Sequence, residues 1–174
     1  MGIRLCEGTF SNPELITIND AAAATPYPST ITVSGLAGTI LKVTATVHGL
    51  THTYLADLHL LLVGPNGQNV VLMDDVGNGN PGVVNATYTF DDDSPNVMTN
   101  TIPTLDNYKP SNNGLLDNLP AGAPQQPPPY GTALSVFNGT DPNGTWSLYV
   151  SDDAGADVGT INNGWSLHII TDCG

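Results

Sequence analysis

Two segments near the C-terminal end of the chain alternate apolar and polar residues. The apolar positions are Trp146, Leu148 and Val150 in the first segment and Trp165, Leu167 and Ile169 in the second. An apolar residue at every second position predicts a β-strand that buries one face. The loop between the two segments holds Asp152, Asp153 and Asp157, and carboxylates so grouped are typical of a loop that binds a hard cation. The pattern therefore predicts the edge of a β-sandwich built around a cation.

The remaining pattern predicts about eight short strands in all and no sustained helical period. Their ranges are 31–33, 40–47, 58–63, 70–73, 86–90, 134–137, 145–151 and 165–170. In the second of these, the residues expected on the buried face are Leu41, Val43, Ala45 and Val47. Strands of this number and spacing favour an all-β fold, a jelly-roll-like β-sandwich. At 174 residues we expect one domain, covering residues 1–174.

Between Ser94 and Thr132 the strand pattern breaks and prolines accumulate, including Pro127-Pro128-Pro129. A connection of this length inside a compact domain is often either functional or wrapped over a sheet surface. The three prolines fit a polyproline II ligand for an aromatic groove or, more simply, a stiffened surface crossing.

The charge balance limits the partners of this chain. Its net charge is -13, because 16 acidic residues face only Arg4, Lys42 and Lys109. Nucleic acid and anionic membranes are therefore not expected as partners, since both are bound through Lys and Arg. No apolar run is long enough to insert into a membrane. Aspartate outnumbers glutamate 14 to 2, which is typical of turns and of cation-binding loops.

The two cysteines, Cys6 and Cys173, lie near the two ends of the chain. A disulfide between them would remove roughly 4 to 5 kcal/mol of denatured-chain entropy in the loop-closure description. Two buried free thiols are the alternative. No CxxC motif supports a metal thiolate site.

Several ordered blocks of residues carry a family resemblance. They are residues 52–58 (HTYLADL) with 60–67, 89–92, 136–139, and 144–148 with 157–159. Together they resemble the P domain that follows the subtilisin-like catalytic domain of proprotein convertases, and similar modules of bacterial secreted and surface proteins. The resemblance covers roughly residues 31–171. It implies a non-catalytic, extracellular β-sandwich that stabilises or positions a neighbouring domain, often with bound calcium. We expect any export signal to lie outside the printed sequence.

The candidate calcium ligands are aspartates at the ends of predicted strands. They are Asp57, Asp152 and Asp157, which are favoured by motif position, together with Asp153, Asp91, Asp92, Asp74 and Asp75. Ca²⁺ takes six to eight oxygen ligands, and loops at neighbouring strand ends can supply them. Unneutralised carboxylates in one place repel each other, and no Lys or Arg lies near these loops in the sequence. The alternative is that each pair is a solvated turn. No EF-hand spacing is present.

Histidine and aromatic residues suggest other functions, which the sequence supports less. Neither HExxH nor GxSxG occurs, so no hydrolase site is expected. His52 is expected to make a buried structural hydrogen bond near Asp57. Trp146 and Trp165 are expected in the core. The candidates for an exposed patch that binds a surface glycan or a protein, the alternative function, are Tyr54, Tyr88, Tyr108 and Tyr130.

Overall fold

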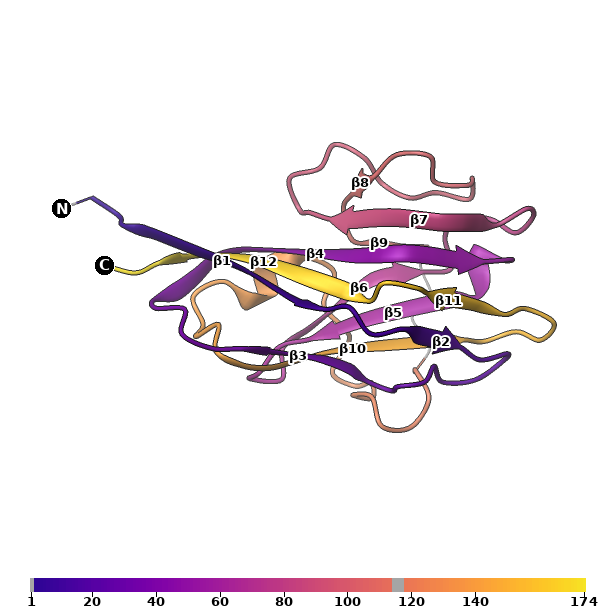
Figure 1. The fold of residues 1–174 in the computed structure, drawn as a ribbon, viewed down its shortest axis with the longest axis horizontal. Coiled ribbons are helices and arrows are strands. Elements are labelled where there is room, and N and C mark those ends of the chain that lie inside the picture. The colour runs from indigo at the N-terminus through magenta and orange to yellow at the C-terminus, as the bar shows by residue number, and fades with distance from the viewer. Residues whose placement is uncertain (1, 114–117) are drawn as a thin grey trace.

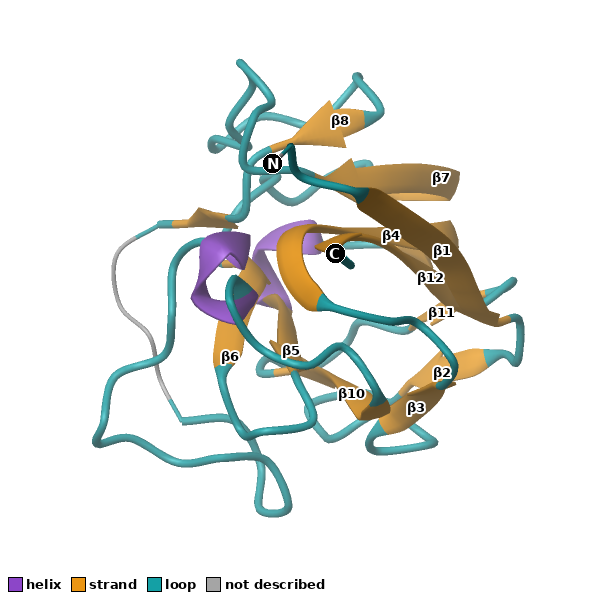
Figure 2. Cartoon of the chain, turned by 90° about the vertical axis from the view of Figure 1, so that its left-hand side faces the viewer, coloured by secondary structure: helices purple, strands orange, loops and turns teal. Residues whose placement is uncertain are grey.

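A computed structural model describes residues 2–113 and 118–174 as two packed β-sheets (Figures 1 and 2). Seven strands form the first sheet: β1 (Leu5–Asn12), β12 (Trp165–Asp172), β4 (Thr39–His52), β11 (Gly159–Ile161), β2 (Ile16–Ile18), β7 (Val83–Phe90) and β8 (Asn107–Tyr108). Five form the second sheet: β3 (Ser29–Val33), β10 (Gly144–Asp152), β5 (Leu58–Val63), β6 (Asn69–Asp74) and β9 (Ser111–Asn112). The β-sandwich prediction is confirmed, with twelve strands in the described ranges rather than about eight.

The main core fills the space between the two sheets. The alternating residues of β10 and β12 point into it, and Trp146 and Trp165 are at most 1% exposed. These two strands lie in different sheets, β10 between β3 and β5 and β12 between β1 and β4. The prediction that they form an edge of the sandwich is therefore wrong, although their strand character is confirmed.

A second apolar cluster covers the outer face of the five-stranded sheet. Leu61 and Val71 pack there against Leu119, Ala123 and Tyr130. Because the proline-rich crossing lies over this face, β5 is buried on both sides and its sequence is apolar apart from His59. The crossing thus acts as a wrap over a sheet, one of the two roles expected for it.

Two local predictions fail for identifiable reasons. Residues Leu134–Phe137 form a 3-10 helix, η2, whose buried residues Leu134 and Phe137 are three apart, as a three-residue turn requires. Leu41 is exposed because the β4–β12 register shifts beside it, at a β-bulge that carries one extra residue.

A disulfide joins Cys6 of β1 to Cys173, the residue after β12, with a Cα–Cα distance of 5.8 Å. The disulfide prediction is confirmed and the free-thiol alternative is wrong. Both termini lie at this end of the sandwich (Figures 1 and 2). Within the described residues, the structure contains no helix of the length and apolarity needed to cross a membrane.

Candidate functional site

Carboxylates from two loops meet at the end of the sandwich away from the termini (Figure 1). Asp57 ends the 3-10 turn η1 (Leu55–Asp57) before β5, and Asp152 is the last residue of β10. The backbone N–H of Asp153 donates to the carbonyl oxygen of Asp57 at 3.0 Å, which fixes the loops against each other. The side chains of Asp57 and Asp157 share a hydrogen bond. We call Asp57, Asp152, Asp153 and Asp157 the acid cluster.

The electrostatics of the acid cluster are concentrated on Asp57. Burial raises the pKa of its carboxyl, the hydrogen bond that the protonated carboxyl donates to Asp157 raises it further, and the charges of Asp153, Asp157 and Asp152 add to the effect. The pKa of Asp57 is thereby raised to about 6. In the chain without a cation, a proton therefore partly offsets the repulsion between the carboxylates.

A third loop reaches the same place. Asp157 accepts a hydrogen bond from the Thr53 hydroxyl at 2.9 Å, and its backbone N–H donates to Asp20 Oδ1 at 3.2 Å. Asp20 follows β2 and was not among the predicted ligands. Its position depends on the pairing of β2 with β11, which no local sequence signal indicates.

His52 holds Asp152 in place. The backbone N–H of Tyr54 donates to His52 Nδ1 at 3.1 Å, so Nδ1 carries no proton. The ring proton is therefore on Nε2, which donates to Asp152 Oδ2 at 2.9 Å. Both side chains are fully buried. The structural role expected for His52 is confirmed, and because both of its nitrogens are occupied, His52 is not available to a metal.

Asp91 and Asp92 lie outside the acid cluster. Lys42 forms ion pairs with Asp93 and, at 3.0 Å, with Asp91. The carboxylate of Asp92 accepts hydrogen bonds from the backbone N–H groups of Leu134 and Ser135, at the start of η2. The expectation that no basic residue lies near these aspartates is wrong. They follow β7 directly, and β7 pairs with β4, the strand that carries Lys42. Their carboxylates bond Lys42 and the backbone of η2 instead of the acid cluster.

Asp74 and Asp75 belong to a neighbouring group around His59. His59 Nδ1 bonds Asp74 Oδ1, and His59 Nε2 lies 3.0 Å from Asp153 Oδ2. Burial alone lowers the pKa of His59, but the hydrogen bonds and charges of Asp74 and Asp153 outweigh it and raise the pKa to about 9. His59 was not among the predicted ligands, because its partners come from β6 and from the loop after β10.

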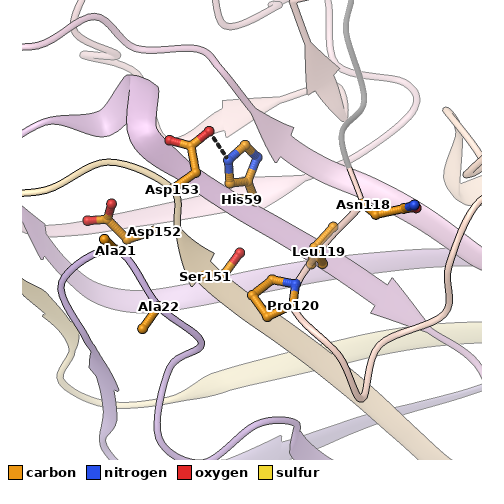
Figure 3. Close-up of a pocket in the computed structure, with 9 residues that line it drawn as sticks. All are labelled: Ala21, Ala22, His59, Asn118, Leu119, Pro120, Ser151, Asp152 and Asp153. Atoms are coloured by element: carbon orange, nitrogen blue, oxygen red, sulfur yellow. Dashed lines mark ion pairs between the residues drawn. The ribbon is translucent and has the colours of Figure 1, made fainter.

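A cavity of about 420 Å³ opens beside this group (Figure 3). Its lining includes His59, Asp153, Ser151 and, from the proline-rich crossing, Leu119 and Pro120. Figure 3 shows the His59 ring facing the Asp153 carboxylate at one side of this space.

The prediction of an exposed tyrosine patch is wrong for three of its four residues. Tyr88, Tyr108 and Tyr130 are at most 5% exposed. The hydroxyls of Tyr88 and Tyr130 donate to the carbonyl oxygens of Pro103 and Pro124, which anchors the long crossing. Tyr54 is 39% exposed and is the one aromatic side chain among the large exposed apolar residues of the described ranges.

The fold defines the chain as a two-sheet β-sandwich module. The chain belongs to the Proprotein convertase P-domain family, whose profile matches residues 40–169. The family prediction made from the motif blocks is therefore confirmed.

One relative is the transglutaminase-activating metalloprotease of Streptomyces mobaraensis, which is 38% identical over 82 residues. The match covers 47% of this chain and 10% of that protein. Two solved structures also match, the serine protease of Aeromonas sobria and its complex with the chaperone ORF2, with TM-scores of 0.44 and 0.45 at 14% identity. Each match covers 97% of this chain and 27% of the protease chain.

In the metal-free chain, stability is expected to fall as pH rises from about 4 to about 6. The folded pKa of Asp57, about 6, lies above its ordinary value of 3.8, so the folded state holds this proton more tightly. The contribution is fully present below 3.8 and is lost as pH rises through about 6. Urea unfolding of EDTA-treated chain across this range measures it.

Asp57→Asn is expected to flatten this pH dependence, whereas Asp106→Asn, at an exposed aspartate outside the cluster, is expected to retain it. His59 contributes with the same sign in a higher window, between its ordinary value of 6.5 and about 9, and so does not obscure the result. An unchanged profile in Asp57→Asn would contradict the assignment.

Proposed function

We propose that this chain is a non-catalytic, calcium-binding accessory domain of a larger secreted protein, with a protease as its neighbour. Membership of the P-domain family and the partial match to a bacterial metalloprotease support the accessory role. The chain spans about a tenth of that relative's length, so the parent protein's activity is itself part of the proposal. In this proposal the module acts outside the cell.

The observation that carries the calcium proposal is the gathering of four carboxylates away from every Lys and Arg of the described ranges, with His59 beside Asp153 as the nearby cationic side chain. Lys42 and Lys109 bond the Asp91–Asp93 segment, and Arg4 lies beside Cys173 at the opposite end. Like charges this close are unfavourable unless protons or a cation neutralise them. Carboxylate oxygens on flexible loops suit Ca²⁺, whereas Mg²⁺ demands near-ideal octahedral geometry and loses its water reluctantly.

Calcium at this position would replace the proton that Asp57 shares with Asp157. It would also connect loops that are distant in the sequence, because Asp20, Asp57 and Asp157 follow three different strands or turns. The disulfide ties the end that holds the termini, and the ion would tie the opposite end. A sandwich held at both ends presents a rigid surface to a neighbouring domain.

Calcium is expected to raise the melting temperature of EDTA-treated chain. Free Ca²⁺ at a hundred times the dissociation constant adds about 2.7 kcal/mol of stability. For a domain of this size that corresponds to a shift of about 5–10 °C. Mg²⁺ at the same concentration is expected to do much less. Differential scanning calorimetry in each ion measures the effect.

Two variants make this experiment specific. Asp57→Asn keeps the shape of the side chain but removes one charge from the acid cluster, and it is expected to lose most of the calcium-induced shift. Asp106→Asn removes the same charge elsewhere and is expected to keep the shift. An equal shift in both variants would place calcium outside the acid cluster.

A further inference from the structure

A second group of metal-ligating side chains lies on the outer face of the five-stranded sheet. His59 of β5, Asp74 at the end of β6 and Asp75 each offer a ligand atom, and these atoms lie within 4.8 Å of one another. His59 and Asp74 are directly opposite in the β5–β6 register. Successive residues of a regular strand point to opposite faces, but β6 ends at Asp74 and Asp75 has a φ of 52°. Both carboxylates can therefore approach the same ring.

One oxygen atom of this group, Oδ2 of Asp74, makes no hydrogen bond within the described residues and has no part in the calcium proposal. Asp74 is 2% exposed, and His59 bonds its Oδ1. Its Oδ2 is fully buried and has no hydrogen-bond partner within residues 2–113 and 118–174. A buried acceptor without a partner carries an uncompensated desolvation cost. A ligand that accepts electron pairs at this point would remove that cost.

The donor set selects the class of ligand. Ca²⁺ and Mg²⁺ take oxygen ligands, whereas one imidazole nitrogen with two carboxylates suits Zn²⁺ and the neighbouring transition-metal dications. The cavity of about 420 Å³ that His59 lines brings solvent-accessible space to one member of this group, on the side of the ring that faces Asp153 (Figure 3). Asp153 faces the other nitrogen of the same ring at 3.0 Å, which holds the imidazole in orientation.

We propose that His59, Asp74 and Asp75 form a binding site for a transition-metal dication of the Zn²⁺ class, separate from the acid cluster. The ion takes the place of the proton between His59 and Asp74, which is released to solvent. It neutralises the buried carboxylate of Asp74 and links the end of β6 to β5. None of its three ligands belongs to the acid cluster, and Asp153 of that cluster contacts the site only as the outer partner of the His59 ring.

Zinc titration in the presence of calcium tests this site. Chain stripped with EDTA is dialysed into millimolar Ca²⁺ and titrated with ZnCl₂ in a calorimeter, and the metal content after desalting is measured by mass spectrometry. One Zn²⁺ per chain is expected, and calcium is expected to leave this stoichiometry unchanged because it takes none of the three zinc ligands. His59→Gln and Asp74→Asn are each expected to weaken binding by more than about tenfold, the least that loss of even an outer partner of a metal ligand costs.

The matched control is His168→Gln. His168 is a more exposed histidine, 3.1 Å from Glu7, and its loss is expected to leave zinc binding unchanged. Asp57→Asn is also expected to bind zinc normally, which separates this proposal from the calcium proposal. Absence of stoichiometric zinc, displacement of zinc by Ca²⁺, or loss of binding in His168→Gln would overturn the site and leave a buried water as the partner of Asp74.

A measurement on the unmodified chain covers the case in which the His59 or Asp74 variants do not fold. Co²⁺ is added to calcium-saturated chain, and the imidazole resonances are followed by NMR. Paramagnetic shifts confined to the His59 ring are expected. Shifts at His168, or no shifted imidazole, would overturn the proposal equally.

Discussion

Replacing Cys6 and Cys173 together by serine is expected to lower the free energy of unfolding by about 5 kcal/mol. The two residues are 167 positions apart, so their disulfide closes almost the whole chain into one loop. Loop-closure entropy grows with loop length. Because this loop is almost as long as the chain, the disulfide restricts the unfolded chain nearly as strongly as a single disulfide can in a domain of this size. Urea unfolding of the oxidised chain and the double variant measures the difference.

The structure gives the disulfide a local role as well. β1 pairs only with β12, and no residue of β1 is buried. Apolar burial therefore contributes little to holding this edge strand, and we expect β1 to separate first in the double variant. Reduction by dithiothreitol should bring the wild-type chain to the stability of the variant and leave the variant unchanged. Equal midpoints for the oxidised chain and the variant would contradict this account.

Trp165→Ala is expected to cost about 3–5 kcal/mol, in the range of large-to-small substitutions in a core. Trp165 is 1% exposed on β12, and its indole N–H donates to the hydroxyl of Ser29 on β3 at 2.9 Å. One side chain thus contacts both sheets through packing and through a hydrogen bond. Its removal leaves a cavity between them and takes from the Ser29 hydroxyl one of its two donors, the other being the side-chain amide of Asn12 at 3.3 Å.

Trp165→Phe is the matched comparison. The phenyl ring keeps most of the buried apolar surface but cannot donate to Ser29, so a smaller loss is expected, closer to the about 1 kcal/mol of one hydrogen bond. The free energies come from urea unfolding of both variants. A loss in Trp165→Ala no larger than in Trp165→Phe would show that packing between the sheets at this point contributes little.

The sequence predicts strands that place several large apolar residues in the core, alternating in β10 and β12 and nearly continuous in β5 and β6, and misses strands that place few there. β10 and β12 carry large apolar residues at every second position, and both were predicted. β1 has no buried residue, because it is an edge strand held by backbone pairing to β12, so hydrophobic patterning could not find it. The sheet to which each strand belongs depends on pairing between distant segments, which explains the wrong assignment of β10 and β12 to one edge.

The same limit applies to the candidate sites. Asp57, Asp152 and Asp157 were favoured because their motif positions match the family, and in the structure Asp152 and Asp157 lie close enough to Asp57 to act on its charge. Asp91 and Asp92 show a similar run of acids after a strand, yet Lys42 and η2 bind this segment from far away in the chain. His59 gave no local signal, since its partner Asp74 is defined by the register of β5 with β6.

Calorimetric titration of EDTA-treated chain with Ca²⁺ tests the central claim most directly. The account predicts saturable binding of at least one Ca²⁺ per chain, with a dissociation constant of about a millimolar or tighter. It also predicts that Asp57→Asn weakens this binding and that Asp106→Asn does not. No saturable heat with the wild-type chain, or equal binding by both variants, would contradict the assignment of the acid cluster as a calcium site.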